Sequence, residues 1–244
     1  MNIVCIANDI PLPANSGGRV DVWRRLCAFK AAGHKIFLLC WVDIGRVDPP
    51  SEAIMNQLRQ VCEDIKWLPI RRSGSEIMRR SFLLWRWPSH VAARWVTADI
   101  HAIYQWAKSF NPQLVWLDGL YGGAVAQHLA QMLGKPLWYR SHNIEHHYMA
   151  AQRVRENRFI RRLGLWANCL GLEHFERSLI SHAQKVFDIS QSDAQFWREQ
   201  KLCQQVNWLP TLVDPEFCQR LADSPKSNQW DIVYFGNLTT PNNI

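Results

Sequence analysis

The densest group of side chains able to bind ligands or transfer protons lies in Leu137–Tyr148, with the sequence LWYRSHNIEHHY. Its first three residues, Leu137–Tyr139, are apolar and predict a buried strand, which places His142 just beyond the strand's carboxyl end. Open parallel sheets bind ligands at the carboxyl ends of their strands. An imidazole at such a position can hold a hydroxyl group or move a proton near neutral pH. We therefore predict that His142 is a catalytic residue.

The same letters allow two other interpretations. His142–His146 matches the H-x-x-E-H pattern of inverted zinc peptidases, in which two histidines on one helical face bind zinc and the glutamate activates water. That site requires a helix through His142, whereas the residues before it predict a strand and a loop, and spacing indicates no third ligand. Alternatively, His142 is a solvated loop residue, with His146 and His147 as surface or capping groups. A zinc hydrolase is thus an alternative function.

Gly17 and Gly18 form a second candidate site. They follow a predicted strand, Asn2–Ala7, and a loop rich in turn-forming residues, and they precede a predicted helix, Val20–Ala32. Glycines at this point let the backbone approach a ligand closely, and the free amide groups of a helix start favour a phosphate or another anion. The pattern is neither G-x-G-x-x-G nor a P-loop. Glycines that only form a tight turn explain it equally well.

Short apolar strands alternate with helices along the rest of the chain. Further strands are predicted at Lys35–Trp41, Ile65–Ile70, Leu114–Leu117, Lys185–Ile189 and Val206–Leu209. Helices are predicted at Ser51–Val61, Ser75–Trp87, Val91–Phe110, Gly122–Leu133 and Asp193–Gln200, the last capped by Ser190 or Ser192, with a helical segment Met149–Ser181 that bends at Gly164. This order predicts an α/β fold with a doubly wound parallel sheet of Rossmann type. Three loops, Gly17-Gly18, Asp118–Gly123 and His142–His147, should then meet at one edge.

Composition describes an ordinary globular chain. Of its 244 residues, 48% are hydrophobic and 20% are charged, and no apolar run approaches the length of a transmembrane helix. The first residues read as a strand instead of a signal peptide, which predicts a cytoplasmic protein. The seven cysteines are scattered singly without a C-x-x-C pair, as expected for small buried apolar residues.

The net charge of +7 is carried mostly by arginines in Arg71–Arg86 and Arg153–Arg162, which suits a partner with phosphate groups. Tryptophan accompanies arginine in Arg71–Trp87, a combination typical of the membrane interface, although its helical pattern also fits buried packing. We predict that this segment binds an anionic membrane surface, with the protein peripheral on the inner membrane face. A non-catalytic membrane-binding or partner-binding domain is therefore a further alternative. The charged segment Met149–Ser181 reads as a solvated face.

Several separated stretches together resemble the N-terminal half of a retaining glycosyltransferase of family 4, an enzyme of the GT-B fold with two facing doubly wound domains. The matching stretches, spread over nearly the entire chain, are the Gly17-Gly18 loop with Arg19, Gly33–Ile36, Arg140–Glu145, Val186–Asp193, Leu209–Pro210 with Val213–Asp214, and Val233–Leu238 with Pro241-Asn242. Each is weak alone, and their order and spacing make the set specific. One departure is Pro210–Asp214, where Thr211-Leu212 replaces the family's usual Asn-Gly.

The resemblance implies an N-terminal acceptor-side domain at 1–222, a linker at 223–229, and only the first strand of a truncated nucleotide-sugar-binding domain at 230–244. It implies transfer of a sugar from a nucleotide-sugar donor to a sugar or lipid-linked acceptor with retained configuration, in surface polysaccharide or glycolipid synthesis. The chain alone should be inactive. His142 would lie beside the donor sugar, with Gly17, Gly18, Arg19, Asp118, Asn143 and Glu145 as substrate-binding residues. Neither a metal, a cofactor nor a nucleic-acid partner is expected.

Overall fold

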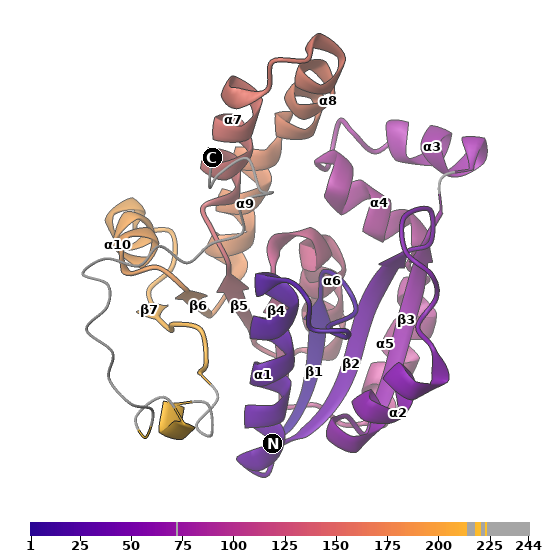
Figure 1. Cartoon of the computed structure of the whole chain (residues 1–244), viewed down its shortest axis with the longest axis vertical. Helices are drawn as coiled ribbons and strands as arrows, with labels where there is room; N and C mark the ends of the chain where they lie inside the picture. The colour runs from indigo at the N-terminus through magenta and orange to yellow at the C-terminus, as the bar shows by residue number, and fades with distance from the viewer. Residues whose placement is uncertain (72, 214–217, 221–222, 224–244) are drawn as a thin grey trace.

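A computed structural model describes residues 1–71, 73–213, 218–220 and 223 of the chain. In this part, seven strands form one sheet in the order β3-β2-β1-β4-β5-β6-β7, and every neighbouring pair is parallel (Figure 1). The strands are β1 (Asn2–Ala7), β2 (Lys35–Asp43), β3 (Asp64–Ile70), β4 (Leu114–Asp118), β5 (Leu137–Ser141), β6 (Lys185–Asp188) and β7 (Val206–Trp208). Strand order reverses between β1 and β4, as in the Rossmann arrangement. The predicted fold class is confirmed.

Helices connect the strands on both faces of the sheet. They are α1 (Gly17–Ala31), α2 (Glu52–Val61), α3 (Gly74–Ser81), α4 (Ser89–Thr97), α5 (Ile100–Ser109), the 3-10 turn η1 (Leu120–Gly122), α6 (Gly123–Leu133), α7 (Glu145–Arg155), α8 (Phe159–Cys169), α9 (Leu172–His182) and α10 (Gln191–Gln200). Because each crossover passes through a helix, all strands run the same way and their carboxyl ends share one edge. In Figure 1, α7 and α8 project from the end of the molecule towards which β2 points.

Successive strand residues pack alternately into two separate hydrophobic cores, one on each face of the sheet. In β1, Val4 and Ile6 face the core beneath α4, α5, α6, α9 and α10, whereas Ile3 and Cys5 face the core beneath α1 and α2. The central strands are therefore apolar on both faces and read as continuous hydrophobic runs, which explains why they are visible in the sequence. Tyr139 at the centre of β5 is buried in the first core.

Two long helical segments divide where the sequence predicts continuity. Val91–Phe110 is interrupted between α4 and α5, because the Asp99 side chain accepts the amide hydrogen of Ala102 at 3.0 Å and starts a new helix. Met149–Ser181 is divided into α7, α8 and α9 at residues 156–158 and at Gly171, whose φ is 68°.

The predicted bend at Gly164 is wrong, because this residue lies inside α8, where a glycine in an exposed turn costs only about 1 kcal/mol relative to alanine. Some helix boundaries also differ from the prediction by three residues or more. Helix α1 begins at Gly17, three residues before the predicted start, and α3 ends at Ser81, well before Trp87.

Ser190, one of the two predicted caps, accepts the amide hydrogen of Asp193 at the start of α10. The predicted strand at 230–244 and the linker at 223–229, apart from residue 223, lie outside the described residues. Among the described helices, none combines the length and apolarity that a bilayer crossing needs.

Candidate functional site

The three predicted loops do meet at the carboxyl edge of the sheet. His142 directly follows β5, Asp118 is the last residue of the neighbouring strand β4, and the imidazole Nε2 lies 2.6 Å from the Asp118 Oδ1 atom. A methyl group built on Gly18 would lie 4.0 Å from the other ring nitrogen, Nδ1. His142 therefore stands between a buried carboxylate and the glycine start of α1, as the sequence predicts.

The charge of Asp118 sets the protonation of His142. Burial alone would lower the histidine pKa, but the hydrogen bond and negative charge of Asp118 outweigh it and raise the pKa above its usual value. The reverse holds for Asp118, where burial is outweighed by His142 and by Arg25, so that its pKa is lowered. Asp118 is thus ionised and accepts the Nε2 proton. When His142 is neutral, its Nδ1 is left as a hydrogen-bond acceptor facing α1.

A buried network of alternating charges supports this pair. Asp21 of α1 forms ion pairs with Arg25 and with Arg140, each at 3.1 Å, and the Arg25 Nε lies 3.6 Å from Asp118. All four side chains are almost fully buried, so each charge depends on its partners for stabilisation. Burial and the neighbouring Arg25 lower the pKa of Arg140. Sequence reasoning missed Asp21 and Arg25, since charges four apart on a helix usually indicate an exposed face.

Glu145 and Asn143 lie beside the pair of His142 and Asp118, but they differ in burial. Glu145 opens α7 and accepts a hydrogen bond from the Tyr121 hydroxyl, while burial and the charge of Glu176 raise its pKa. Asn143 is exposed, and its backbone carbonyl accepts the Ser141 hydroxyl hydrogen at 2.9 Å. The structure therefore brings Glu145 into the site and leaves the side chain of Asn143 at its rim.

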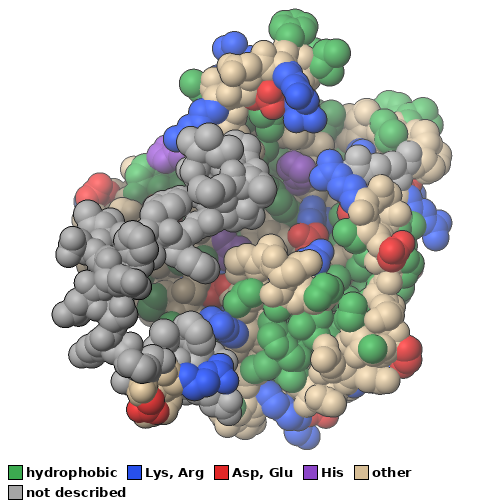
Figure 2. Space-filling view, in the orientation of Figure 1, with side chains coloured by type: hydrophobic (Ala, Val, Ile, Leu, Met, Phe, Trp, Pro, Cys, Tyr) green, Lys and Arg blue, Asp and Glu red, His purple; other side chains and the backbone are tan. Residues whose placement is uncertain are grey.

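Arg19, in the first turn of α1, faces a cavity of about 470 Å³ at the ends of β1 and β2. Its other walls include Asp9, Trp41, Arg80, Arg94 and Tyr121. Arg94 is fixed by hydrogen bonds to the Asn8 carbonyl and to Asp9, and its guanidinium lies 5.0 Å from the Tyr121 ring. Figure 2 shows histidine and charged side chains gathered in the hollow on this face of the molecule. Aromatic walls with fixed polar groups are suited to carbohydrate.

Asn8 holds the loop after β4 in place. Its Oδ1 accepts the amide hydrogens of Tyr121 at 2.9 Å and Gly122 at 3.3 Å. Gly119 precedes them with a φ of 89°, and a Cβ there would approach the Asn8 Nδ2 atom to 2.2 Å. Only glycine fits this position, both in backbone conformation and in space.

Asp188, at the carboxyl end of β6, is a further buried acid, paired in register with Ser141 of β5. Burial raises its pKa to about 7, with a contribution from the charge of Asp193, against the opposing effects of Ser141 and Arg140. Its burial was not predictable from the sequence, because an aspartate at a strand end is usually solvated.

The zinc-peptidase interpretation is wrong in its structural premise. Helix α7 begins only at Glu145, so His142 lies outside it, and His146 hydrogen-bonds Glu176 at 2.5 Å instead of pointing with His142 to a common centre. Donor atoms of Asp21, Asp118 and His142 do lie within 4.8 Å of one another. Two guanidinium groups already neutralise these carboxylates, which disfavours a bound cation. The expected absence of a metal stays a prediction.

No model of a known protein family matches this chain. It is 23% identical over 246 residues to an uncharacterized 44.6 kDa protein in the cps region of Klebsiella pneumoniae, covering 99% of this chain and 57% of that protein. Among solved structures it is similar to Phytolacca americana UGT2 complexed with UDP-2fluoro-glucose and pterostilbene, with a TM-score of 0.51, 11% identity, and coverage of 92% of this chain and 57% of that one.

The lipopolysaccharide outer core galactosyltransferase WaaB in its apo form gives a TM-score of 0.44 at 15% identity, covering 88% of this chain and 47% of that chain. The chain thus spans about half the length of the proteins it matches. The likeness to UGT2 supports the fold, and these structural neighbours are glycosyltransferases of the GT-B type.

Proposed function

We propose that this chain is the N-terminal, acceptor-side part of a retaining glycosyltransferase of family 4 that uses a nucleotide-sugar donor. Support comes from the Rossmann-type sheet that it shares with UGT2, a protein complexed with UDP-2fluoro-glucose. The order of the motifs along the sequence favours family 4. Because nucleotide binding in this family belongs to the second domain, transfer would need residues beyond those described.

The observation that carries the proposal is the placement of His142 between Asp118 and Gly18. The donor sugar would lie over this edge, with one hydroxyl donating a hydrogen bond to Nδ1 of His142. Amide groups in the first turn of α1 are free of helix hydrogen bonds and would face a phosphate of the donor or a polar group of the acceptor. Both contacts come from rigid elements, which is what a precisely oriented reaction requires.

In the proposed reaction the bond between the anomeric carbon and the diphosphate oxygen breaks. A bond from the acceptor hydroxyl oxygen to the same carbon forms on the same face of the sugar, and the hydroxyl proton passes to the leaving diphosphate. The sugar carries partial positive charge in this transition state. His142 holds the sugar in place through a hydroxyl, and the ionised Asp118 behind it keeps the imidazole in the tautomer that accepts this hydrogen bond.

The acceptor would occupy the cavity lined by Arg19, Trp41 and Tyr121, next to the contact between Tyr121 and Glu145. A role in surface polysaccharide or glycolipid synthesis is supported by the relative encoded in a cps region. In the predicted membrane surface, Arg71–Trp87, the side chains of Met78, Phe82 and Trp85 are exposed, which favours peripheral binding to an anionic bilayer.

Assays of sugar transfer by the full-length protein with a panel of nucleotide sugars test the proposal. The variant His142→Ala should lose transfer by about 10²-fold, because the sugar is no longer held in place, with its circular dichroism unchanged. His147→Ala, which removes an exposed histidine from the adjacent helix α7, is the matched control and should retain sugar transfer. Unchanged turnover in His142→Ala would remove this residue from the site, and the absence of transfer with every nucleotide sugar would contradict the proposed function.

A further inference from the structure

Helix α8 carries two apolar faces, of which only one is covered. Leu165 and Cys169 pack against the hydrophobic core. On the outer face, a second stripe recurs at helical spacing with exposed fractions that are high for such side chains: Phe159 78%, Ile160 84%, Leu163 54%, Trp166 47% and, just beyond the helix, Leu170 46%. Isolated exposed apolar residues are ordinary, whereas a contiguous stripe of this length indicates an interaction surface.

The hairpin of α7 and α8 also contains an arginine-lined pocket. Its volume is about 610 Å³, and its walls include Arg155, Arg158 and Arg161 together with Gln152 and Asn157. Within the described part of the chain, the guanidinium groups of Arg158 and Arg161 have no ion-pair or hydrogen-bond partner. One carboxylate, Glu156, also lines the pocket, and it accepts the Arg158 amide hydrogen at 2.9 Å. Positive charge therefore dominates this pocket.

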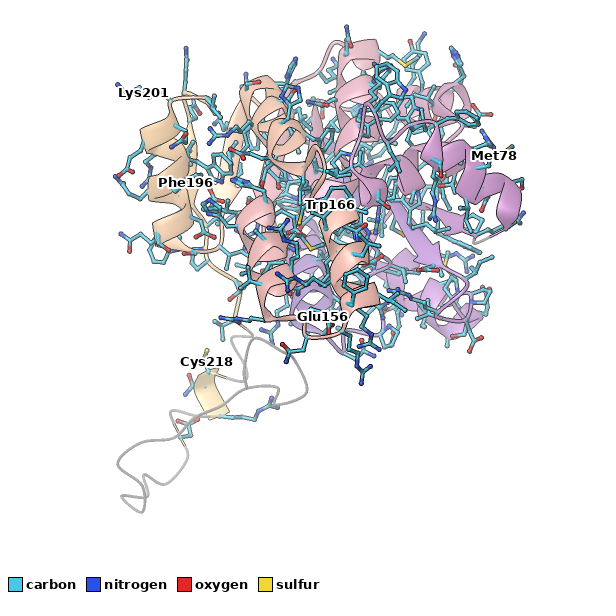
Figure 3. All side chains as sticks on the ribbon, turned by 90° about the horizontal axis from the view of Figure 1, so that it is seen from above. Met78, Glu156, Trp166, Phe196, Lys201 and Cys218 are labelled. Carbon is cyan, nitrogen blue, oxygen red and sulfur yellow. The ribbon has the colours of Figure 1, made fainter. Side chains whose placement is uncertain are left out.

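The two features lie together at one end of the molecule. Figure 2 shows green apolar and blue basic side chains on the hairpin that Figure 1 identifies as α7 and α8. Figure 3, which looks onto this end, shows Trp166 on α8 and Glu156 at the turn before it, with Met78 on the separate helix α3. Five arginines and one glutamate occupy residues 153–162. An apolar ridge and an anion pocket are thus parts of one surface, hereafter the hairpin surface.

The chemistry of the hairpin surface selects among possible partners. A nucleic acid would bind the arginines through its phosphates but would leave the apolar side chains of Ile160 and Leu163 exposed to solvent. Protein interfaces usually lose charged residues from their centres, whereas here arginines 158, 161 and 162 lie directly beside Phe159, Ile160 and Leu163. A short helix with large apolar residues on one side, arginine beside them and a tryptophan is the pattern of interfacial membrane binding. Arginine contributes further where the lipid headgroups are anionic.

We propose that the hairpin surface binds an anionic membrane, with Phe159, Ile160 and Trp166 entering the interface and the pocket between α7 and α8 taking a lipid phosphate group. Arg158 and Arg161 bind the phosphate, since a planar guanidinium forms paired hydrogen bonds to its oxygens. This surface is separate from Arg71–Trp87 and does not depend on the proposed transferase activity. Because the hairpin projects from the end where the strands finish, membrane binding would turn the candidate site towards the bilayer.

Sedimentation with vesicles tests the proposal directly. The chain should bind vesicles of phosphatidylcholine mixed with phosphatidylglycerol, and should bind those of phosphatidylcholine alone far more weakly. The double variant Arg158→Ala/Arg161→Ala should lose about 30-fold in affinity for the anionic vesicles, since each arginine contributes about fivefold. Phe159→Ser/Ile160→Ser should lose at least about tenfold on both vesicle types. Circular dichroism should be unchanged in both variants, because these four side chains are exposed.

Control variants separate the alternatives. Arg59→Ala, an exposed arginine on α2, should bind like the original chain. If Met78→Ser/Trp85→Ser abolishes binding while the hairpin variants retain it, the segment Arg71–Trp87 alone binds the membrane and the proposal is overturned. Loss of self-association in Phe159→Ser/Ile160→Ser with unchanged vesicle binding would instead identify the stripe as a contact between copies of the chain.

Titration with glycerol phosphate distinguishes the source of the phosphate. Vesicle binding that depends on Arg158 and Arg161 supports a lipid headgroup. If glycerol phosphate binds through the same two arginines while vesicle binding is unaffected by their loss, the pocket takes a free phosphate compound, and the lipid proposal is overturned.

Discussion

The imidazole of His142 and the carboxylate of Asp118 lie 2.6 Å apart at the ends of two adjacent parallel strands, β4 and β5. Parallel pairing fixes this relationship, because Asp118 pairs in register with Arg140 and His142 follows two residues later at the same edge of the sheet. The pair needs no flexible loop to form. Its geometry therefore yields predictions about the pKa of His142 and about the pH dependence of turnover.

Replacement of Asp118 by asparagine should lower the pKa of His142. Burial already lowers this pKa, and the hydrogen bond and charge of Asp118 are what raise it. An NMR titration of the His142 ring protons in the original chain and in Asp118→Asn measures the difference. Asp48→Asn, which neutralises an exposed acid, serves as the control and should leave the titration unchanged. A His142 pKa that does not fall would show that the carboxylate does not govern the ring.

Turnover by the full-length protein should depend on pH through His142. If Nδ1 accepts a hydrogen bond from the donor sugar, only the neutral imidazole is competent, so kcat should rise with pH through a pKa above the ordinary 6.5. In Asp118→Asn the midpoint should move to lower pH. If the pH profile of kcat is the same in both proteins, the group whose titration governs turnover is not His142.

Asp188 should make the folded chain less stable as pH rises. Its folded pKa of about 7 exceeds the unfolded value near 3.8, so the folded state favours the neutral acid. The destabilisation is absent below the unfolded value, grows between the two values and is complete above about 7, where it reaches at most about 4 kcal/mol. Urea unfolding across this range should show a smaller decline for Asp188→Asn, and Asp48→Asn should behave like the original chain.

Two glycine substitutions should have opposite effects. Gly119→Ala places a Cβ in a backbone conformation with φ of 89° and against the Asn8 side chain, so it should lower the free energy of unfolding by more than about 2 kcal/mol. Gly164→Ala lies within α8 with open space around it, and should raise that free energy by about 0.4 to 1 kcal/mol. The free energy of unfolding of both variants is measured by chemical denaturation. Equal changes in the two variants would contradict the conformations assigned to Gly119 and Gly164.

The sequence predicted well what periodicity and strand order determine. The bounds of β1 agree with prediction to the residue, and the convergence of Gly18, Asp118 and His142 follows from parallel strands that share one edge. Charge partners were not predictable, because Asp21 and Arg140 are 119 positions apart and only the packing of α1 on the sheet brings them together. The breaks at Asp99 and Gly171 were hidden within long helical patterns.

The face of a helix is equally hard to infer from composition. The arginines of 153–162 suggested a solvated face, and the structure does leave them largely exposed. What the sequence did not reveal is that the large apolar residues between them are exposed as well, since Phe159 and Ile160 would ordinarily be assigned to the core.

Arg140 has a second consequence, which concerns the path of the backbone after the sheet. Besides Asp21, its guanidinium donates a hydrogen bond to the Leu209 carbonyl, and Arg24 of α1 donates one to the Leu212 carbonyl at 2.9 Å. The first hydrogen bond connects Leu209 to the charges behind His142, and the second connects Leu212 to α1. Any displacement of the backbone at Leu209 would therefore reach the imidazole through Arg140, Asp21, Arg25 and Asp118.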